Sequence, residues 1–374
     1  MTRGLSLYLD LVRFGAALAV VMTHLAYPDL SGGMLLPWRQ VGNDAVMVFF
    51  VLSGFVIAHV AHEKEHDVRA YAVSRLARLW SVAVPALLIT LLLDQAGRML
   101  DPAAYAAWWY QASDPVLRML RALSFTNEIW FSSIRPFSNG PWWSLGYEAL
   151  YYAIFAAIFY FRGAKRWLLA GGLMLLAGPK ILLLLPIWWL GVWTWLRCRQ
   201  DPVAPRAALL LFGGSVLAYA LLRWSGVPVV LKQATALVIG PENVVPYLHF
   251  SDEFVASYLI GPLVAMHFLG AHGLSAALEA RLGEWRRPIA WFAQSTFALY
   301  LLHYPMLRFA EAALGYDINS PWQVAAIFGG VVGTCVLVGP LIERTKGGWK
   351  ALIARMLGGG VPVSRPVPSP AAPG

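Results

Sequence analysis

The first long apolar stretch, LSLYLDLVRFGAALAVVMTHLAY from Leu5 to Tyr27, decides the fold class. Its length matches the roughly 20 apolar residues that an α-helix needs to cross a bilayer. Asp10 and Arg13 interrupt it near its start, and His24 interrupts it near its end. Ionisable groups are costly at membrane depth and therefore often mark a site or a pathway. The stretch predicts a membrane helix that carries chemistry.

Arg13 and His24 are expected on one face of this helix. Eleven residues separate them, which places them within about 20° of each other and about 16 Å apart along the axis. One face then presents a cation toward one side of the membrane and an imidazole toward the other. A structural interpretation is also open, in which Asp10 and Arg13 form an i,i+3 ion pair and His24 is an interfacial residue.

The composition indicates an integral membrane protein. The 374 residues are 59% hydrophobic and 13% charged, which is unlike a soluble globular chain. The net charge of +9 comes without a basic stripe or nucleic-acid motif, so no nucleic-acid partner is expected. The two cysteines, Cys198 and Cys335, indicate neither a disulfide framework nor a metal site.

The hydrophobic runs predict an all-α polytopic bundle of about ten transmembrane helices, embedded in the lipid bilayer. We assign residues 1–345 to one transmembrane domain and 346–374 to a cytoplasmic tail that its composition predicts to be disordered. The predicted spans are 5–27, 43–61, 79–97, 144–161, 166–178, 180–196, 207–223, 254–271, 289–311 and 321–343.

Charge distribution predicts the orientation. With the N-terminus in the cytoplasm, roughly two thirds of the Lys and Arg residues fall on the inner side, as the positive-inside rule requires. Both termini are then cytoplasmic. The apolar run 226–240 would be an eleventh span, but that would place the basic 279–287 segment outside. We therefore interpret 226–253 as an outer loop, in part re-entrant.

Polar groups in the second span and at the inner mouth of the third span are the next candidates. Asp44 lies at the start of GNDAVMVFFVLSGFVIA (42–58), where a negative charge interacts favourably with the helix dipole. Ser53-Gly54 within the same segment is typical of close helix packing. Arg75 and Arg78 in SRLARLW (74–80) share a face at i,i+3. Such a pair can bind phosphate, although ordinary positive-inside flanking explains it as well.

Two later segments also place polar side chains on one face of an apolar helix. NGPWWSLGYEALYY (139–152) places Ser144, Glu148 and Tyr152 on one helix face at i, i+4 and i+8. A carboxylate one turn into an apolar span needs a partner. STFALYLLHYP (295–305) places Tyr300 and His303, with Thr296, on one side of the ninth span. A histidine before proline at a helix end is also often structural.

These segments, in this order, resemble the integral-membrane acyltransferase-3 family over about the first 340 residues. The resemblance rests on LDLVRFGAALAVVMTHL, NDAVMVFFVLSGFVIA, the SRLARL arginines, WSLGYEALYY and STFALYLLHYP. Ser81 stands where the family usually has proline, so the start of that helix is expected to differ. The resemblance implies O-acylation of an extracytoplasmic glycan or glycoconjugate, with cytoplasmic acyl-CoA, usually acetyl-CoA, as donor and without a metal.

The family resemblance also implies catalytic roles. His24 resembles the general base or transient acyl carrier, roles that suit an imidazole near neutral pH. Asp44 or Glu148 is expected to orient its other nitrogen. Arg13 resembles the family's membrane-embedded arginine, which steers or polarises the thioester.

The donor and the acceptor have their own candidates. Arg75 and Arg78 resemble the family's residues that contact the CoA phosphates. Arg13 and Ser53 are assigned to positions further along the donor path. The residues assigned to the acceptor are Trp143, Tyr300 and His303. The resemblance also implies a bacterial-type inner (plasma) membrane; the acceptor's identity and the oligomeric state stay open.

Three competing interpretations are open. Arg13, Glu148 and His24 would also suit the path of a transporter for a polar or anionic substrate. His24 to Asp29 fits the H-x4-D pattern of glycerolipid acyltransferases, without the Gly-rich acidic block that follows there. The chain can also be a structural subunit of a synthase.

Overall fold

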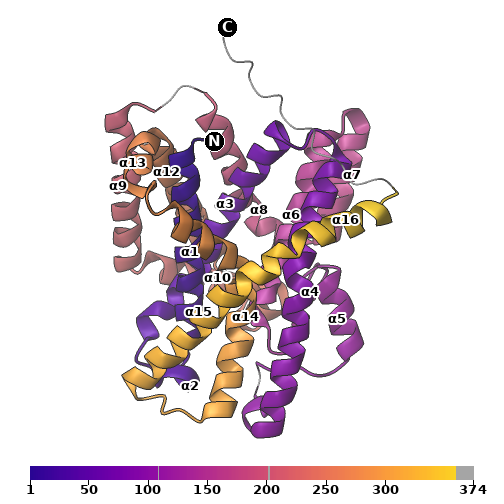
Figure 1. Cartoon of the computed structure of the whole chain (residues 1–374), viewed down its shortest axis with the longest axis vertical. Coiled ribbons are helices and arrows are strands. Elements are labelled where there is room, and N and C mark those ends of the chain that lie inside the picture. The colour runs from indigo at the N-terminus through magenta and orange to yellow at the C-terminus, as the bar shows by residue number, and fades with distance from the viewer. Residues whose placement is uncertain (108, 201–202, 359–374) are drawn as a thin grey trace.

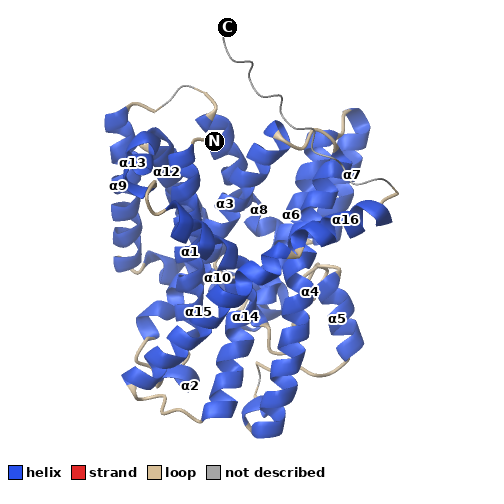
Figure 2. Cartoon of the chain, in the orientation of Figure 1, coloured by secondary structure: helices blue, strands red, loops and turns tan. Residues whose placement is uncertain are grey.

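The computed structural model describes residues 1–107, 109–200 and 203–358, and these ranges contain helices and loops but no strand (Figures 1 and 2). Every predicted span corresponds to one helix. These helices are α1 (Arg3–Leu25), α3 (Val41–Glu63), α4 (Val68–Leu100), α6 (Trp143–Tyr160), α7 (Gly163–Ala177), α8 (Pro179–Cys198), α9 (Pro205–Trp224), α12 (Phe254–Gly273), α14 (Arg286–Leu314) and α15 (Pro321–Arg344). The all-helical membrane fold is therefore confirmed.

Within the described ranges, seven helical stretches are long and apolar enough to cross a membrane, by length and composition. Helices α6, α7 and α14 are not among these seven. Ten crossings and the side on which the termini lie remain predictions. Figure 1 places the N-terminus at one end of the molecule and α2 (Pro28–Ser31) at the other, so α1 runs along much of its length.

Two segments differ from their prediction. Residues 346–356, assigned to a disordered tail, form α16 (Lys346–Met356), whose Ile353 and Ala354 pack on Val73 and Ala77 of α4. The Arg69 side chain also donates to the Ala354 carbonyl over 3.2 Å. The segment interpreted as an outer, partly re-entrant loop at 226–253 is mostly helical, with α10 (Val227–Ile239) and α11 (Pro241–Asn243), while its re-entry remains a prediction. The remainder of the predicted tail, 359–374, lies outside the described residues.

Glycine allows α3 and α8 to pack closely. A Cβ atom on Gly54 would lie 2.0 Å from the Trp188 carbonyl oxygen, and one on Gly191 would lie 1.9 Å from that of Val51. Both distances are too short for any side chain larger than hydrogen, as is typical of packed membrane helices. The packing interpretation of Gly54 is confirmed, and the close approach fixes the neighbouring Ser53.

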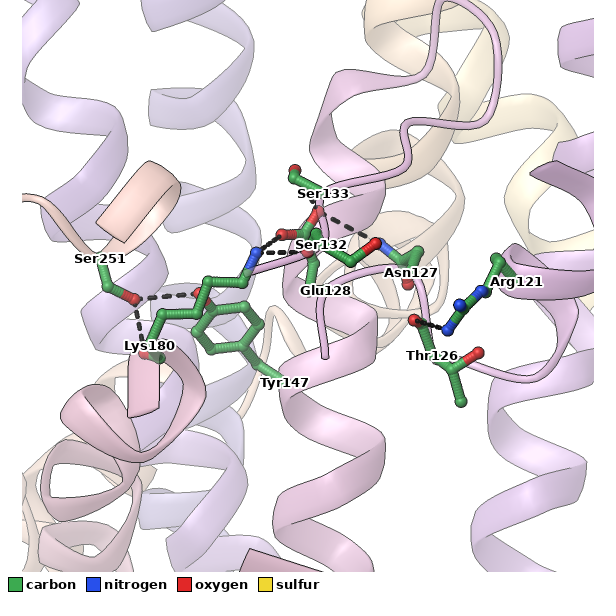
Figure 3. A network of polar contacts seen from close by, with 9 residues as sticks. All are labelled: Arg121, Thr126, Asn127, Glu128, Ser132, Ser133, Tyr147, Lys180 and Ser251. Atoms are coloured by element: carbon green, nitrogen blue, oxygen red, sulfur yellow. Dashed lines mark hydrogen bonds and ion pairs between the residues drawn. The ribbon is translucent and has the colours of Figure 1, made fainter. Parts of the chain in front are cut away.

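A buried ion pair anchors the segment before α6 (Figure 3). Lys180, at the start of α8, donates to Glu128 over 2.7 Å and to the Ser132 carbonyl over 2.5 Å, while Ser133 donates to the other Glu128 oxygen over 2.8 Å. Burial raises the pKa of Glu128, and the adjacent ammonium opposes that rise. The pair ties the 124–139 segment to α8.

That segment in turn reaches α14. The Asn139 amide donates to the Leu301 carbonyl over 2.8 Å and to the Thr90 hydroxyl over 3.0 Å, and all of these groups are buried. Asn139 therefore links the start of α6 to α4 and to the turn of α14 that carries His303. The ion pair and this amide together hold the frame of the site described below.

Candidate active site

A cavity of about 320 Å³ opens among α1, α3, α4, α6 and α14, and its wall also includes Glu343 near the end of α15. It brings together six of the residues predicted from the sequence. They are Arg13, Ser53, Arg75, Arg78, Glu148 and Tyr300. Polar groups are spread along the wall. We call the part lined by Asp10, Arg13, Arg75 and Arg78 the arginine end, and the part lined by Ser144 and Tyr300 the tyrosine end.

The three arginines of the arginine end differ in their partners. Arg13 forms the expected ion pair with Asp10 over 2.8 Å, so the structural interpretation of these two residues is confirmed while Arg13 also lines the cavity. Arg75 forms a largely buried ion pair with Glu65 over 2.8 Å. The Arg78 side chain forms no hydrogen bond or ion pair with any residue that the structure describes, although the carboxylates of Glu148, Glu343 and Asp10 lie near enough to attract it. Arg78 is therefore the cation most available to an anionic ligand.

The middle of the cavity holds a hydrogen-bonded carboxylate. Glu148 Oε1 accepts a hydrogen bond from the Ser53 hydroxyl over 2.8 Å and another from the Tyr152 hydroxyl. The Trp188 indole donates to the Ser53 oxygen over 3.1 Å. These contacts join α3, α6 and α8, and they fix the carboxylate in one orientation.

The tyrosine end is closed by neutral groups. The Tyr300 and Ser144 hydroxyls lie 2.8 Å apart, and the Tyr300 ring meets Phe49 edge-on with centroids 5.6 Å apart. The Tyr300 ring also lies 6.4 Å from the His303 ring, centroid to centroid. Trp143, predicted to bind the acceptor, does not line this cavity and stacks on Phe250 at 4.8 Å.

His24 and His303 form a contact between α1 and α14. His303 Nε2 lies 3.1 Å from His24 Nδ1, and the two ring centroids are 4.9 Å apart. Each Nδ1 atom also lies 2.9 Å from a carbonyl oxygen one turn earlier, that of Val20 for His24 and that of Leu299 for His303. His303 is fully buried, whereas sequence reasoning had assigned it to the acceptor.

These carbonyls determine the tautomers. A carbonyl oxygen accepts hydrogen bonds and never donates them, so both Nδ1 atoms carry the proton in the neutral rings. His303 Nε2 is then an acceptor that faces the His24 Nδ1–H. The remaining nitrogen of His24, Nε2, carries a lone pair and makes no hydrogen bond with the described residues. The arrangement provides a base whose second nitrogen is supported.

Within the part of the chain that the structure describes, no carboxylate contacts His24, contrary to prediction. Asp44 is 3% exposed and pairs instead with Arg223 over 3.3 Å and with the Tyr219 hydroxyl over 2.7 Å. It lines a separate apolar cavity among α1, α3, α9 and α12. Glu148 is bonded to Ser53, as described above. The predicted orienting role is therefore wrong for Asp44 and Glu148 in this structure, because the groups that contact His24 Nδ1 are an imidazole and a backbone carbonyl.

Arg308 is a polar group near His24 that sequence reasoning missed. Its side chain is fully buried and pairs with Asp29 over 2.7 Å and with Glu311 over 2.9 Å. It also donates to the Tyr304 hydroxyl over 3.1 Å, and the Tyr304 ring centroid lies 4.9 Å from that of His24. Asp29, the aspartate of the H-x4-D pattern, thus binds Arg308. A charge five residues after His303 in a predicted span was the available signal.

The fold and the site define a polytopic membrane protein with a cavity between its helices, a cationic end to that cavity and a nearby histidine pair. Residues 6–339 match the family described as "Acyltransferase domain", and the chain therefore belongs to the acyltransferase-3 family. Acyltransferase MdmB from Streptomyces mycarofaciens is 26% identical over 362 residues, covering 87% of this chain and 85% of the relative. No solved structure matches the chain. The protein is thus a membrane acyltransferase.

Proposed function

We propose that the protein moves an acyl group, in the first instance acetyl, from cytoplasmic acyl-CoA to a hydroxyl of an extracytoplasmic glycan or glycoconjugate, in a bacterial-type inner membrane. The observation that carries the proposal is the order of groups across the bundle. At one end of the cavity lies the Arg78 guanidinium, which forms no hydrogen bond or ion pair with the described residues. Beyond the other end lies His24, whose Nε2 lone pair likewise has no partner among them. These are the two groups that a transfer from a phosphate-bearing donor to a hydroxyl requires.

Donor binding is assigned to the arginine end. The Arg78 side chain faces the cavity without a hydrogen-bond or ion-pair partner among the described residues, and a guanidinium binds phosphate oxygens in a fixed, often bidentate geometry. Arg13, oriented by its ion pair with Asp10, places a second guanidinium in the same part of the wall. The flexible pantetheine arm of the donor then extends along the cavity and brings its thioester toward Ser144 and Tyr300.

Proton transfer is assigned to His24. Its Nε2 takes the proton of the acceptor hydroxyl as the oxygen attacks the thioester carbonyl carbon. Collapse of the tetrahedral intermediate breaks the carbon–sulfur bond, and the thiolate takes up the proton from His24, so that CoA leaves as the free thiol. The hydroxyls of Ser144 and Tyr300 bond to each other, and the hydrogen that this contact leaves over can be donated to the carbonyl oxygen.

His303 supports the charged intermediate. When His24 Nε2 binds the proton, the ring becomes a cation and its Nδ1–H becomes a stronger donor. The lone pair of His303 Nε2, 3.1 Å away, accepts that hydrogen bond. His303 thus takes the place that a carboxylate has in a Ser-His-Asp triad, but as a neutral acceptor.

The test is mass spectrometry of surface glycans from cells with and without the protein, and from cells with His24→Ala. We expect O-acyl groups to be present with the natural protein and lost with His24→Ala, because general acid–base catalysis contributes about 10²–10⁴-fold. His267→Gln is the matched control, since His267 is an interhelical histidine of α12 that contacts Tyr8 and Ser215 rather than His24. Unchanged O-acyl content without the protein would overturn the proposal.

A further inference from the structure

The middle of the cavity can accept a hydrogen bond from a ligand but has no hydroxyl hydrogen left to donate. Ser53 and Tyr152 both direct their hydroxyl hydrogens to Glu148 Oε1. The other carboxylate oxygen, Oε2, has no hydrogen-bond partner among the described residues, and Glu148 lines the cavity. A ligand that passes this point therefore meets a free carboxylate oxygen.

We propose that Glu148 binds an amide N–H of the donor's pantetheine arm and thereby sets how deep the donor enters; this rests on acyl-CoA being the donor. A carboxylate attracts N–H donors through charge-assisted hydrogen bonds and repels phosphate. The adenine nucleotide and its phosphates therefore stay at the arginine end. The uncharged arm, which carries two amide groups, passes Glu148.

The helical spacing matches the chemistry of that arm. Ser144, Glu148 and Tyr152 lie one above the other on α6, about 6 Å apart along the axis. If the thioester lies beside Ser144, the arm runs past Glu148 one turn deeper. In acyl-CoA, two methylene groups separate the sulfur from the first amide nitrogen, and the second amide follows further along the arm. An amide therefore falls beside Oε2.

The test is equilibrium binding of acetyl-CoA to the purified full chain in nanodiscs, with two analogues in which one or the other amide is replaced by an ester. We expect the natural protein to bind one ester analogue about ten-fold or more weakly, the usual scale for a hydrogen bond to a charged group. Glu148→Gln is expected to remove that preference. Its amide oxygen stays with the two hydroxyl donors, so that its NH₂ group takes the place of Oε2 and donates instead of accepting.

Two variants separate this contact from other effects. Arg78→Gln should weaken all three ligands equally and keep the amide preference. Glu279→Gln, which removes a carboxylate on α13 that faces Arg3 at 3.7 Å, should change neither. The inference is overturned if the natural protein binds both ester analogues as well as acetyl-CoA, or if Glu148→Gln keeps the amide preference. Failure of the natural protein to bind acetyl-CoA at all would overturn the proposed function together with it.

Discussion

Replacing His303 by Phe keeps a ring of similar size and removes the atom that faces His24. In the resting state the His24 Nδ1–H is still held by the Val20 carbonyl at 2.9 Å, so the free Nε2 base persists. During turnover, however, the protonated His24 ring loses its 3.1 Å acceptor. A hydrogen bond to a charged group is worth about 1.5–3 kcal/mol, which corresponds to a fall in kcat of roughly 10–150-fold.

The assay is steady-state acyl transfer by purified protein, with kcat and KM for acyl-CoA measured separately. KM should stay nearly constant, because His303 does not line the donor cavity. His303→Gln should recover part of the rate, since its side-chain oxygen can accept from His24 Nδ1–H. A purely structural role predicts the reverse order, because Phe fills a buried site better than Gln. A kcat for His303→Phe within about two-fold of the natural value would refute the reasoning.

Two further substitutions test other parts of the structure. Arg78→Gln should weaken acetyl-CoA binding about ten-fold or more but leave acetyl-pantetheine, which has no phosphate, unaffected in the same binding assay; equal losses would contradict phosphate binding. Lys180→Met leaves the buried Glu128 charge without its partner and should destabilise the protein by about 3–5 kcal/mol, seen as a lower Tm in a thermal-shift assay. Adding Glu128→Gln to Lys180→Met should restore part of that Tm, and a Lys180→Met variant with the natural Tm would show that the pair contributes nothing.

Periodicity and hydropathy were sufficient to predict the main helices. The bilayer fixes the length of each apolar run, so every predicted span matches a helix even where α14 carries several polar residues. Helix α16 was missed because its lysines and glycines resemble a solvated tail. Its Trp349 and Ile353, spaced i,i+4, nevertheless pack at α4. A short amphipathic contact of this kind has little weight in a composition-based prediction.

The sequence predicted many of the residues of the site but not which of them contact one another. Local spacing placed Glu148 and Tyr300 on inward faces, and both line the cavity. Which carboxylate meets which cation depends on the mutual packing of helices far apart in the sequence. Asp44 illustrates this, since α9, some 175 residues later, brings Tyr219 to it. The same limit concealed the contact between His24 and His303, although each residue had been selected individually.

The order of charges along the cavity bears on the transporter interpretation. An anion attracted by Arg78 would next meet the Glu148 carboxylate, which repels it, and then the ring of Tyr300, which Ser144 and Phe49 hold across the tyrosine end. An acyl group on a long neutral arm is not subject to that repulsion, because its charge stays behind with the nucleotide. The remaining obstacle is the Tyr300 side chain between the cavity and the histidine pair. Rotation of that side chain away from Ser144 costs one hydrogen bond, about 0.5–1.5 kcal/mol. The repulsion between a phosphate and the Glu148 carboxylate on the cavity wall applies to the nucleotide and not to the arm, so the cavity is suited to passing an acyl group and retaining its carrier.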